Sequence, residues 1–181
     1  MPLGASRFGL MGAEEEGALT LIETQTASSS FLDFESLADY DTYLFTFDQI
    51  TVSTQTEIGY RVERSGSYQA SSYEYANQRN QQGGSTERRD QSQTSVRIGG
   101  DIGTSSTDYM GGYVWLYGAR TSSLMTFTTS QVAFLNSGAG SNEFGSGCHD
   151  TAGTVTGIRF GEGIFSALDS GVISQYGLEE S

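Results

Sequence analysis

The chain has 181 residues, a length that suits one domain with a sizeable core. Hydrophobic residues make up 36% and charged residues 17%, with 24 Gly and 12% aromatics, a profile that favours short strands over the helices of an α/β enzyme. Twenty-two acidic residues oppose nine basic ones, and the net charge of −13 argues against binding to nucleic acid.

The first 17 residues differ from the rest of the chain. Residues 1–17 neither alternate nor follow a helical period, and four Gly residues would destabilise either regular structure. Their apolar side chains are more than a fully solvated tail requires. We therefore expect an extended N-terminal arm that becomes ordered on a neighbouring subunit, with a disordered N-terminus as the alternative. The expected partner-binding residues of the arm are Leu3, Arg7, Phe8, Leu10 and Met11.

Strands follow the arm at short spacing, as the alternation of apolar and polar residues indicates. The strongest alternation lies at Tyr43, Phe45 and Phe47. Residues 113–117 are apolar on both faces, which is typical of a strand that is buried on both sides or covered by a partner subunit. The other runs bring the total to about ten strands. They lie at 19–24, 30–34, 58–62, 73–75, 96–98, 124–135, 154–160 and 171–178.

Nothing in the body of the chain interrupts this succession of strands. The sole Pro is Pro2, and no amphipathic helix is evident, with a helical turn conceivable only at 31–40 and 165–169. We predict an all-β domain over residues 18–181, an antiparallel β-sandwich of jelly-roll-like architecture. Because sandwiches leave strand edges exposed, a homo-oligomer such as a trimer, or docking of a monomer, would cover them.

One stretch, residues 77–93, is long, polar and free of apolar side chains. A connection of this length without structure of its own is usually functional or disordered, and the plainer alternative is a solvated hairpin tip. Its Arg79, Arg88 and Arg89 are candidates for binding a carboxylate, a glycan phosphate or an acidic neighbour.

Residues that could carry catalysis are few. Cys148, His149 and Asp150 are the residue types of a nucleophilic triad, but adjacent residues of an extended chain point to opposite faces and cannot form the relay. No phosphate-binding Gly-rich motif is present, and no pair of carboxylates recommends itself for glycoside hydrolysis. We expect a protein that is not an enzyme and that holds no cofactor.

A metal site is not expected either. The single His excludes a His-rich site. Five acidic residues could collect calcium from loop oxygens, yet they lack the D-x-D-x-D-G spacing, and a solvated acidic rim is the simpler interpretation. These residues are Asp33, Glu35, Asp39, Asp41 and Asp48.

The sequence also bears on where the protein is made. Residues 1–13 lack the hydrophobic core of a secretory signal, and no apolar run approaches the length needed to span a membrane. Cys148 is the single Cys, so no internal disulfide forms and assembly in a reducing cytoplasm is compatible with the composition.

Both ends of the domain resemble a known family. Residues 21–30 (LIETQTASSS) are followed by a strand and then by 40–50 (YDTYLFTFDQI), and the strand at 158–160 (IRF) is followed by a Gly-containing bridge and by 170–178 (SGVISQYGL). This pattern resembles a family of small virion structural proteins of tailed bacteriophages, often marine ones. Gln175 departs from it, since an apolar residue is usual there.

The resemblance implies a β-sandwich component of the virion, assembled in the host cytoplasm. We expect first a capsid decoration (cement) or head-fibre protein, which binds the assembled shell of the major capsid protein through its arm and a sandwich edge. The alternative is a tail-fibre or tail-tip protein, held by a tail adaptor, that binds a host surface glycan through exposed aromatic residues and residues 77–93. A third alternative, a depolymerising enzyme, would need a groove with paired acids.

Overall fold

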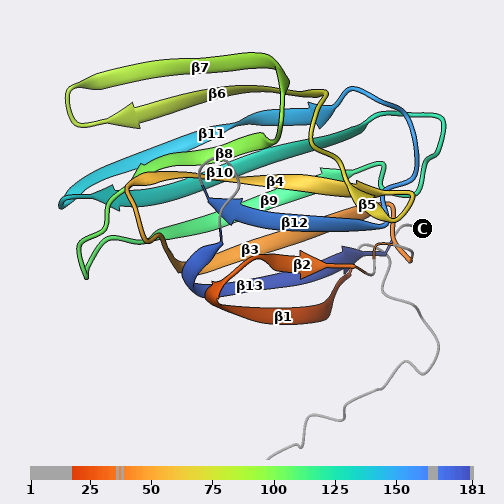
Figure 1. Cartoon of the computed structure of the whole chain (residues 1–181), viewed down its shortest axis with the longest axis horizontal. Coiled ribbons are helices and arrows are strands. Elements are labelled where there is room, and N and C mark those ends of the chain that lie inside the picture. The colour runs from red at the N-terminus through yellow and green to blue at the C-terminus, as the bar shows by residue number, and fades with distance from the viewer. Residues whose placement is uncertain (1–17, 36, 38, 163–166, 180–181) are drawn as a thin grey trace, which may run out of the picture.

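The computed structural model of the chain describes residues 18–35, 37, 39–162 and 167–179, which form strands and connecting turns (Figure 1). Within these ranges no helix occurs that is long and apolar enough to cross a membrane. The strands form two antiparallel sheets packed face to face, so the predicted all-β sandwich is confirmed. The expected arm, with Leu3, Arg7, Phe8, Leu10 and Met11, lies outside the described residues.

The larger sheet has eight strands in the order β1-β13-β3-β9-β10-β11-β6-β7. Their bounds are Leu19–Ser30 (β1), Leu168–Leu178 (β13), Thr42–Thr51 (β3), Met110–Tyr117 (β9), Thr126–Asn136 (β10), Ala139–His149 (β11), Tyr73–Gln81 (β6) and Gly84–Gln93 (β7).

The smaller sheet has the order β2-β12-β4-β5, and β8 also pairs with β4. Its bounds are Leu32–Phe34 (β2), Gly157–Glu162 (β12), Thr56–Arg64 (β4), Ser67–Tyr68 (β5) and Val96–Ile102 (β8). The last two strands of the chain, β12 and β13, are each paired inside a sheet as expected, and they belong to opposite sheets.

The core lies between the sheets and centres on Phe160 of β12. The ring centroid of Phe160 lies 5.2 Å from that of Phe45 and 5.1 Å from that of Phe47, both on β3 of the larger sheet. Phe34 and Tyr60 of the smaller sheet lie 6.1 Å and 6.3 Å away. All four contacts are edge-to-face, the arrangement that aromatic quadrupoles favour. Phe160 therefore joins the two sheets.

Residues 77–93 are not an unstructured connection. They belong to β6 and β7, which pair from Tyr73 opposite Gln93 to Gln81 opposite Gly84 and leave a turn at 82–83. The strand signal is hidden because the inward side chains of β6, such as Asn77 and Arg79, are polar although buried. β11 is hidden as well, because it is rich in Gly and Ser and shows little alternation of apolar and polar residues. Thirteen strands are described rather than about ten.

The structure corrects one smaller expectation and shows how Gln175 is placed. The segment 31–40 contains the strand β2 rather than a helical turn in its described part. Gln175, the departure from the family pattern, does not leave its face of β13 exposed, because its side chain is fully buried. Neither polar atom of its amide has a hydrogen-bond partner among the described residues.

Replacing Phe160 with Ala is expected to lower the free energy of unfolding by about 3–5 kcal/mol, because the substitution empties a site between the sheets that cannot collapse fully. Urea denaturation of the full chain measures the loss. Phe127→Ala is the matched control, since the Phe127 side chain is 53% exposed and its truncation should cost under about 1 kcal/mol. Equal losses in the two variants would contradict the central position of Phe160.

Candidate functional site

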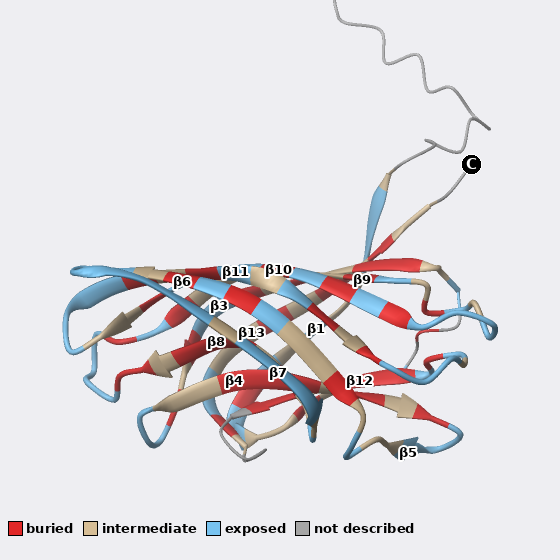
Figure 2. Ribbon diagram, turned by 90° about the horizontal axis from the view of Figure 1, so that it is seen from above, coloured by how far each residue is buried: buried red, intermediate tan, exposed pale blue. Residues whose placement is uncertain are grey.

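The side of the larger sheet that faces away from the smaller sheet carries a group of aromatic residues. Buried and exposed residues alternate along the strands of this sheet (Figure 2). On β9, Val114 and Leu116 are buried, whereas Tyr113 and Tyr117 are 37% and 38% exposed. The strand at 113–117 is therefore not buried on both sides within the chain. Its cover by a partner stays a prediction.

The strand register brings further side chains to the same face. Tyr117 of β9 lies opposite Phe127 of β10, and Tyr113 lies opposite Gln131. Trp115 and Tyr117 stack, with ring centroids 6.4 Å apart and an interplanar angle of 16°. The Tyr113 hydroxyl donates to Oε1 of Gln131 at 2.9 Å. These neighbours on adjacent strands hold the rings in place on the sheet.

We call this surface the aromatic face. It comprises twelve uncharged outward side chains of the middle strands, on a chain that carries a net charge of −13, and the exposed Asp48 further along β3 lies outside it. Aromatic enrichment and depletion of charge mark the centre of a protein interface. The residues are Leu44, Thr46, Tyr113, Trp115, Tyr117, Phe127, Thr129, Gln131, Ala133, Asn142, Phe144 and Ser146.

Two hollows lie along the aromatic face. One, of about 440 Å³, is lined by Tyr113, Gln131, Asn142 and Phe144 among others. The other, of about 600 Å³, lies where Tyr117 and Phe127 meet the turn that follows β9, which adds Leu124 and Met125. Sequence reasoning expected exposed aromatic residues without naming them. Phe144 was hidden by the weak signal of β11. Phe127 was missed because the local alternation of Thr and Phe would place its ring in the core, whereas the neighbouring Thr126 and Thr128 are the buried residues.

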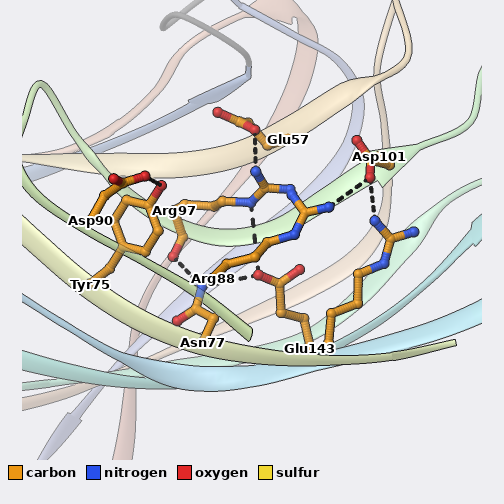
Figure 3. Close-up of polar contacts among 9 residues, drawn as sticks. Glu57, Tyr75, Asn77, Arg88, Asp90, Arg97, Asp101 and Glu143 are labelled. Carbon is orange, nitrogen blue, oxygen red and sulfur yellow. Dashed lines mark hydrogen bonds and ion pairs between the residues drawn. The ribbon is translucent and has the colours of Figure 1, made fainter. Parts of the chain in front are cut away.

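Two of the three Arg residues expected to bind a partner are engaged inside the chain (Figure 3). Arg79 is 5% exposed and forms an ion pair with Oδ2 of Asp101 on β8. Arg88 of β7 reaches the same oxygen with Nη2 at 2.9 Å. The acidic neighbour that these two guanidinium groups bind is therefore Asp101.

Arg89, by contrast, is exposed on β7. It lines a cleft of about 650 Å³ that borders the aromatic face and also includes Phe127 and Cys148. Two acidic residues, Glu74 and Asp90, line this cleft as well, so it offers charges of both signs. Of the three Arg residues, Arg89 is the one placed to contact a partner.

The pairs of Asp101 belong to a larger ionic cluster beneath the β6–β7 hairpin, shown in Figure 3. Arg97 of β8 lies between two carboxylates, with Nη1 2.6 Å from Glu57 and Nε 3.8 Å from Glu143. Glu143 is fully buried and accepts a hydrogen bond from Nδ2 of Asn77 at 3.1 Å. Because these charges are paired, they can occupy the interior and fix the hairpin to β8.

The segment Cys148–Asp150 does not form a catalytic relay. His149 is 4% exposed and packs on the ring of Tyr73, whereas Cys148 lies on the opposite side of β11 and is partly exposed. Burial raises the pKa of the Cys148 thiol, and the charges of Glu74 and Asp150 raise it further. The reactive thiolate is therefore disfavoured.

The acidic residues considered for calcium are dispersed. Asp33 forms an ion pair with Arg159, with Nη2 and Oδ2 2.5 Å apart. Asp41 accepts hydrogen bonds from the backbone of Arg120 and the hydroxyl of Thr121. In the part of the chain that the structure describes, no three His, Cys, Asp or Glu side chains are grouped to hold a metal ion.

No family model, curated protein or solved structure matches the chain. The resemblance of the two chain ends to phage virion proteins therefore stays a hypothesis. The functional argument depends on the residues and their geometry, above all on the aromatic face.

Asp101→Asn is expected to lower stability at pH 7 and to lower it less at pH 3. Burial raises the pKa of Asp101, but hydrogen bonds and charges from Arg79 and Arg88 outweigh burial and bring it below its ordinary value. A lowered pKa in the folded state contributes stability above the unfolded pKa, about 3.9, and that stability is lost as pH falls through the folded pKa. Urea denaturation at the two pH values measures the difference.

Asn suits this position because residue 101 has a φ of 58°, a conformation that Asn tolerates well. Asp48→Asn removes the same charge at an exposed site of β3 and should change stability by under about 0.5 kcal/mol. A loss in Asp101→Asn that is the same at both pH values would show that its charge does not hold the hairpin.

Proposed function

We propose that the chain is a non-enzymatic structural protein of a bacteriophage virion that docks on its partner through the aromatic face. The observation that carries the proposal is an uncharged sheet surface with five aromatic side chains on a strongly acidic chain. Removing large exposed aromatic groups of this kind from water lowers the free energy of a complex with a partner. The resemblance of residues 21–50 and 154–178 to phage virion proteins supports the proposal that the partner is part of a virion.

We infer further that the sandwich is a jelly roll. Eight of its strands follow the jelly-roll order, with β1-β13-β3-β9 in one sheet and β2-β12-β4-β8 in the other. Two insertions then widen the first sheet: β6–β7 between β4 and β8, and β10–β11 between β9 and β12, whereas the short β5 pairs with β4 in the second sheet. Jelly rolls occur in viral capsid proteins and in lectins, so the fold favours a virion by analogy and does not choose between shell and tail.

In the first form of the proposal the partner is the major capsid protein, and the chain is a decoration or head-fibre protein. Binding to the assembled shell but not to free subunits stabilises the shell by mass action. A homo-oligomer, for instance a trimer, would engage several sites at once and strengthen modest individual contacts. The arm at residues 1–17 and a sandwich edge are further contacts in this form.

The second form is a tail-fibre or tail-tip protein that binds a host glycan. The hollow lined by Tyr113, Gln131, Asn142 and Phe144 favours it. Aromatic rings offer flat apolar faces to the C–H groups of a sugar, and the two amides can exchange hydrogen bonds with its hydroxyl groups. The face of β9 to β11, rather than residues 77–93, would then hold the sugar.

The triple variant Tyr113→Ser, Phe127→Ser and Phe144→Ser is expected to weaken binding to shells that lack the protein by at least about tenfold, since one buried aromatic anchor contributes about 2 kcal/mol or more. Cosedimentation with the shells measures binding. Tyr109→Ser is the matched control, because Tyr109 is 46% exposed and lies outside the aromatic face. Full binding by the triple variant would overturn docking through this face.

The number of copies per particle separates the two forms. Quantitative mass spectrometry of purified particles against the major capsid protein should give on the order of hundreds of copies for a shell protein, because an icosahedral shell repeats its sites. A tail protein would give about ten copies or a few tens. In that case glycan binding should be lost in the same triple variant. Absence from the particle would refute both forms.

A further inference from the structure

A separate polar cleft lies beside β5. Figure 1 shows this strand at one end of the sandwich. The turn that follows β4, the segment before β6 and the loop between β11 and β12 meet there and enclose about 730 Å³. Seven Ser and Thr residues line the cleft, together with Arg64 and His149. Hydroxyl groups can donate hydrogen bonds to a ligand as well as accept them.

Arg64, the last residue of β4, forms part of the wall and is 7% exposed. Its Nη1 donates to the backbone oxygen of Thr151, and its Nη2 donates to Oγ1 of Thr126 at 3.0 Å. Its Nε has no partner among the described residues. Both acceptors are neutral, and no described carboxylate forms an ion pair with Arg64.

Other enclosed guanidinium groups of the chain form ion pairs with carboxylates. Arg79 is paired with Asp101, Arg97 with two Glu residues, and Arg159 with Asp33. An enclosed charge without a counter-charge is unfavourable, and removing one partner from a buried pair is strongly destabilising. Arg64 therefore has the electrostatic environment of a pair from which the anion is missing.

The rest of the wall points to the same kind of ligand. Among the described residues, no acidic one lines the cleft, although the chain is acidic overall. Asp150 and Glu63, which are not part of the lining, accept hydrogen bonds from the hydroxyls of the lining residues Thr151 and Thr156. Gly153 lies against the guanidinium, since an added Cβ there would lie 3.0 Å from Nη1 of Arg64. The residues that could repel an anion stand outside the lining.

His149 is the second group of the wall with an unpartnered atom. It is 4% exposed, and its Nδ1 has no hydrogen-bond partner in the described part of the chain. Burial lowers its pKa, and the charge of Arg64 lowers it further, which keeps the imidazole neutral near pH 7. The positive charge of the cleft therefore comes from Arg64.

We propose that this cleft binds an oxyanion, namely a carboxylate, sulfate or phosphate group. Arg64 supplies the counter-charge, and Ser hydroxyls of the wall, such as those of Ser71 and Ser72, donate hydrogen bonds to the oxygens. The oxyanion can come from a free inorganic ion or from an acidic saccharide. The inference does not depend on the aromatic face, because Arg64 and the hydroxyl groups lie outside that face, although Ala152 lines both this cleft and the hollow beside Tyr117 and Phe127.

Isothermal titration calorimetry of the full chain with sodium sulfate and with glucuronate, at constant ionic strength, tests the proposal. Saturable binding of at least one of these anions, and none of glucose, is expected. Arg64→Gln should weaken binding by at least about tenfold, the usual loss for a charge-assisted contact. Tighter binding of glucuronate than of sulfate would identify an acidic saccharide, and equal or weaker binding a free oxyanion.

A second variant keeps the test decisive should Arg64→Gln fold poorly. Ala152 is exposed and lines the cleft beside Thr151, so Ala152→Glu brings a carboxylate to Arg64 and should abolish anion binding without disturbing the core. Ala152→Gln is the matched neutral control and should retain binding. Lack of saturable binding in the wild-type chain, or full binding in Ala152→Glu, would overturn the proposal. The aromatic-face triple variant should bind the anion normally.

Discussion

The contact of Phe160 with both sheets is the interaction on which the rest of the structure depends. Its ring lies against Phe45 and Phe47 of the larger sheet and against Phe34 and Tyr60 of its own. With the sheets joined there, β3 and β9 present alternate residues to the core and to the outside. The aromatic face is thus the reverse side of the same strands whose inward residues make the core.

Away from this centre, charged groups replace apolar ones between the layers. Under β6 and β7 the space is filled by Arg79, Arg97, Asp101 and Glu143, which hold the added hairpin by directed contacts. Such ion pairs and hydrogen bonds fix the register between strands more strictly than apolar packing does. Removing one partner, however, leaves a buried charge unpaired and is strongly destabilising. Ion pairs and hydrogen bonds therefore hold β6 and β7 in place, whereas aromatic packing holds the centre of the sandwich.

The sequence predicted the strands whose buried residues are apolar. It failed to predict the strands whose buried residues are polar. Tyr43, Phe45 and Phe47 announce β3 because their buried face is aromatic. β11 and the part of β6 beyond Tyr75 escaped because Asn77 and Glu143 are buried yet polar, which no local pattern reveals. β7 escaped because it is polar and mostly exposed. The same limit applies to the site: Arg64 carries no sequence signal, since its isolation from carboxylates is a property of the folded chain.

The outermost strand of the larger sheet, β7, has a further consequence. Its residues are mostly exposed, polar and of both charges, with Glu87, Arg89 and Asp90 near its middle. Side chains of this kind discourage a foreign strand from joining the ladder there. In the virion setting that we propose, where copies would be crowded at high local concentration, this strand would oppose sheet formation between neighbouring copies and would keep them discrete units.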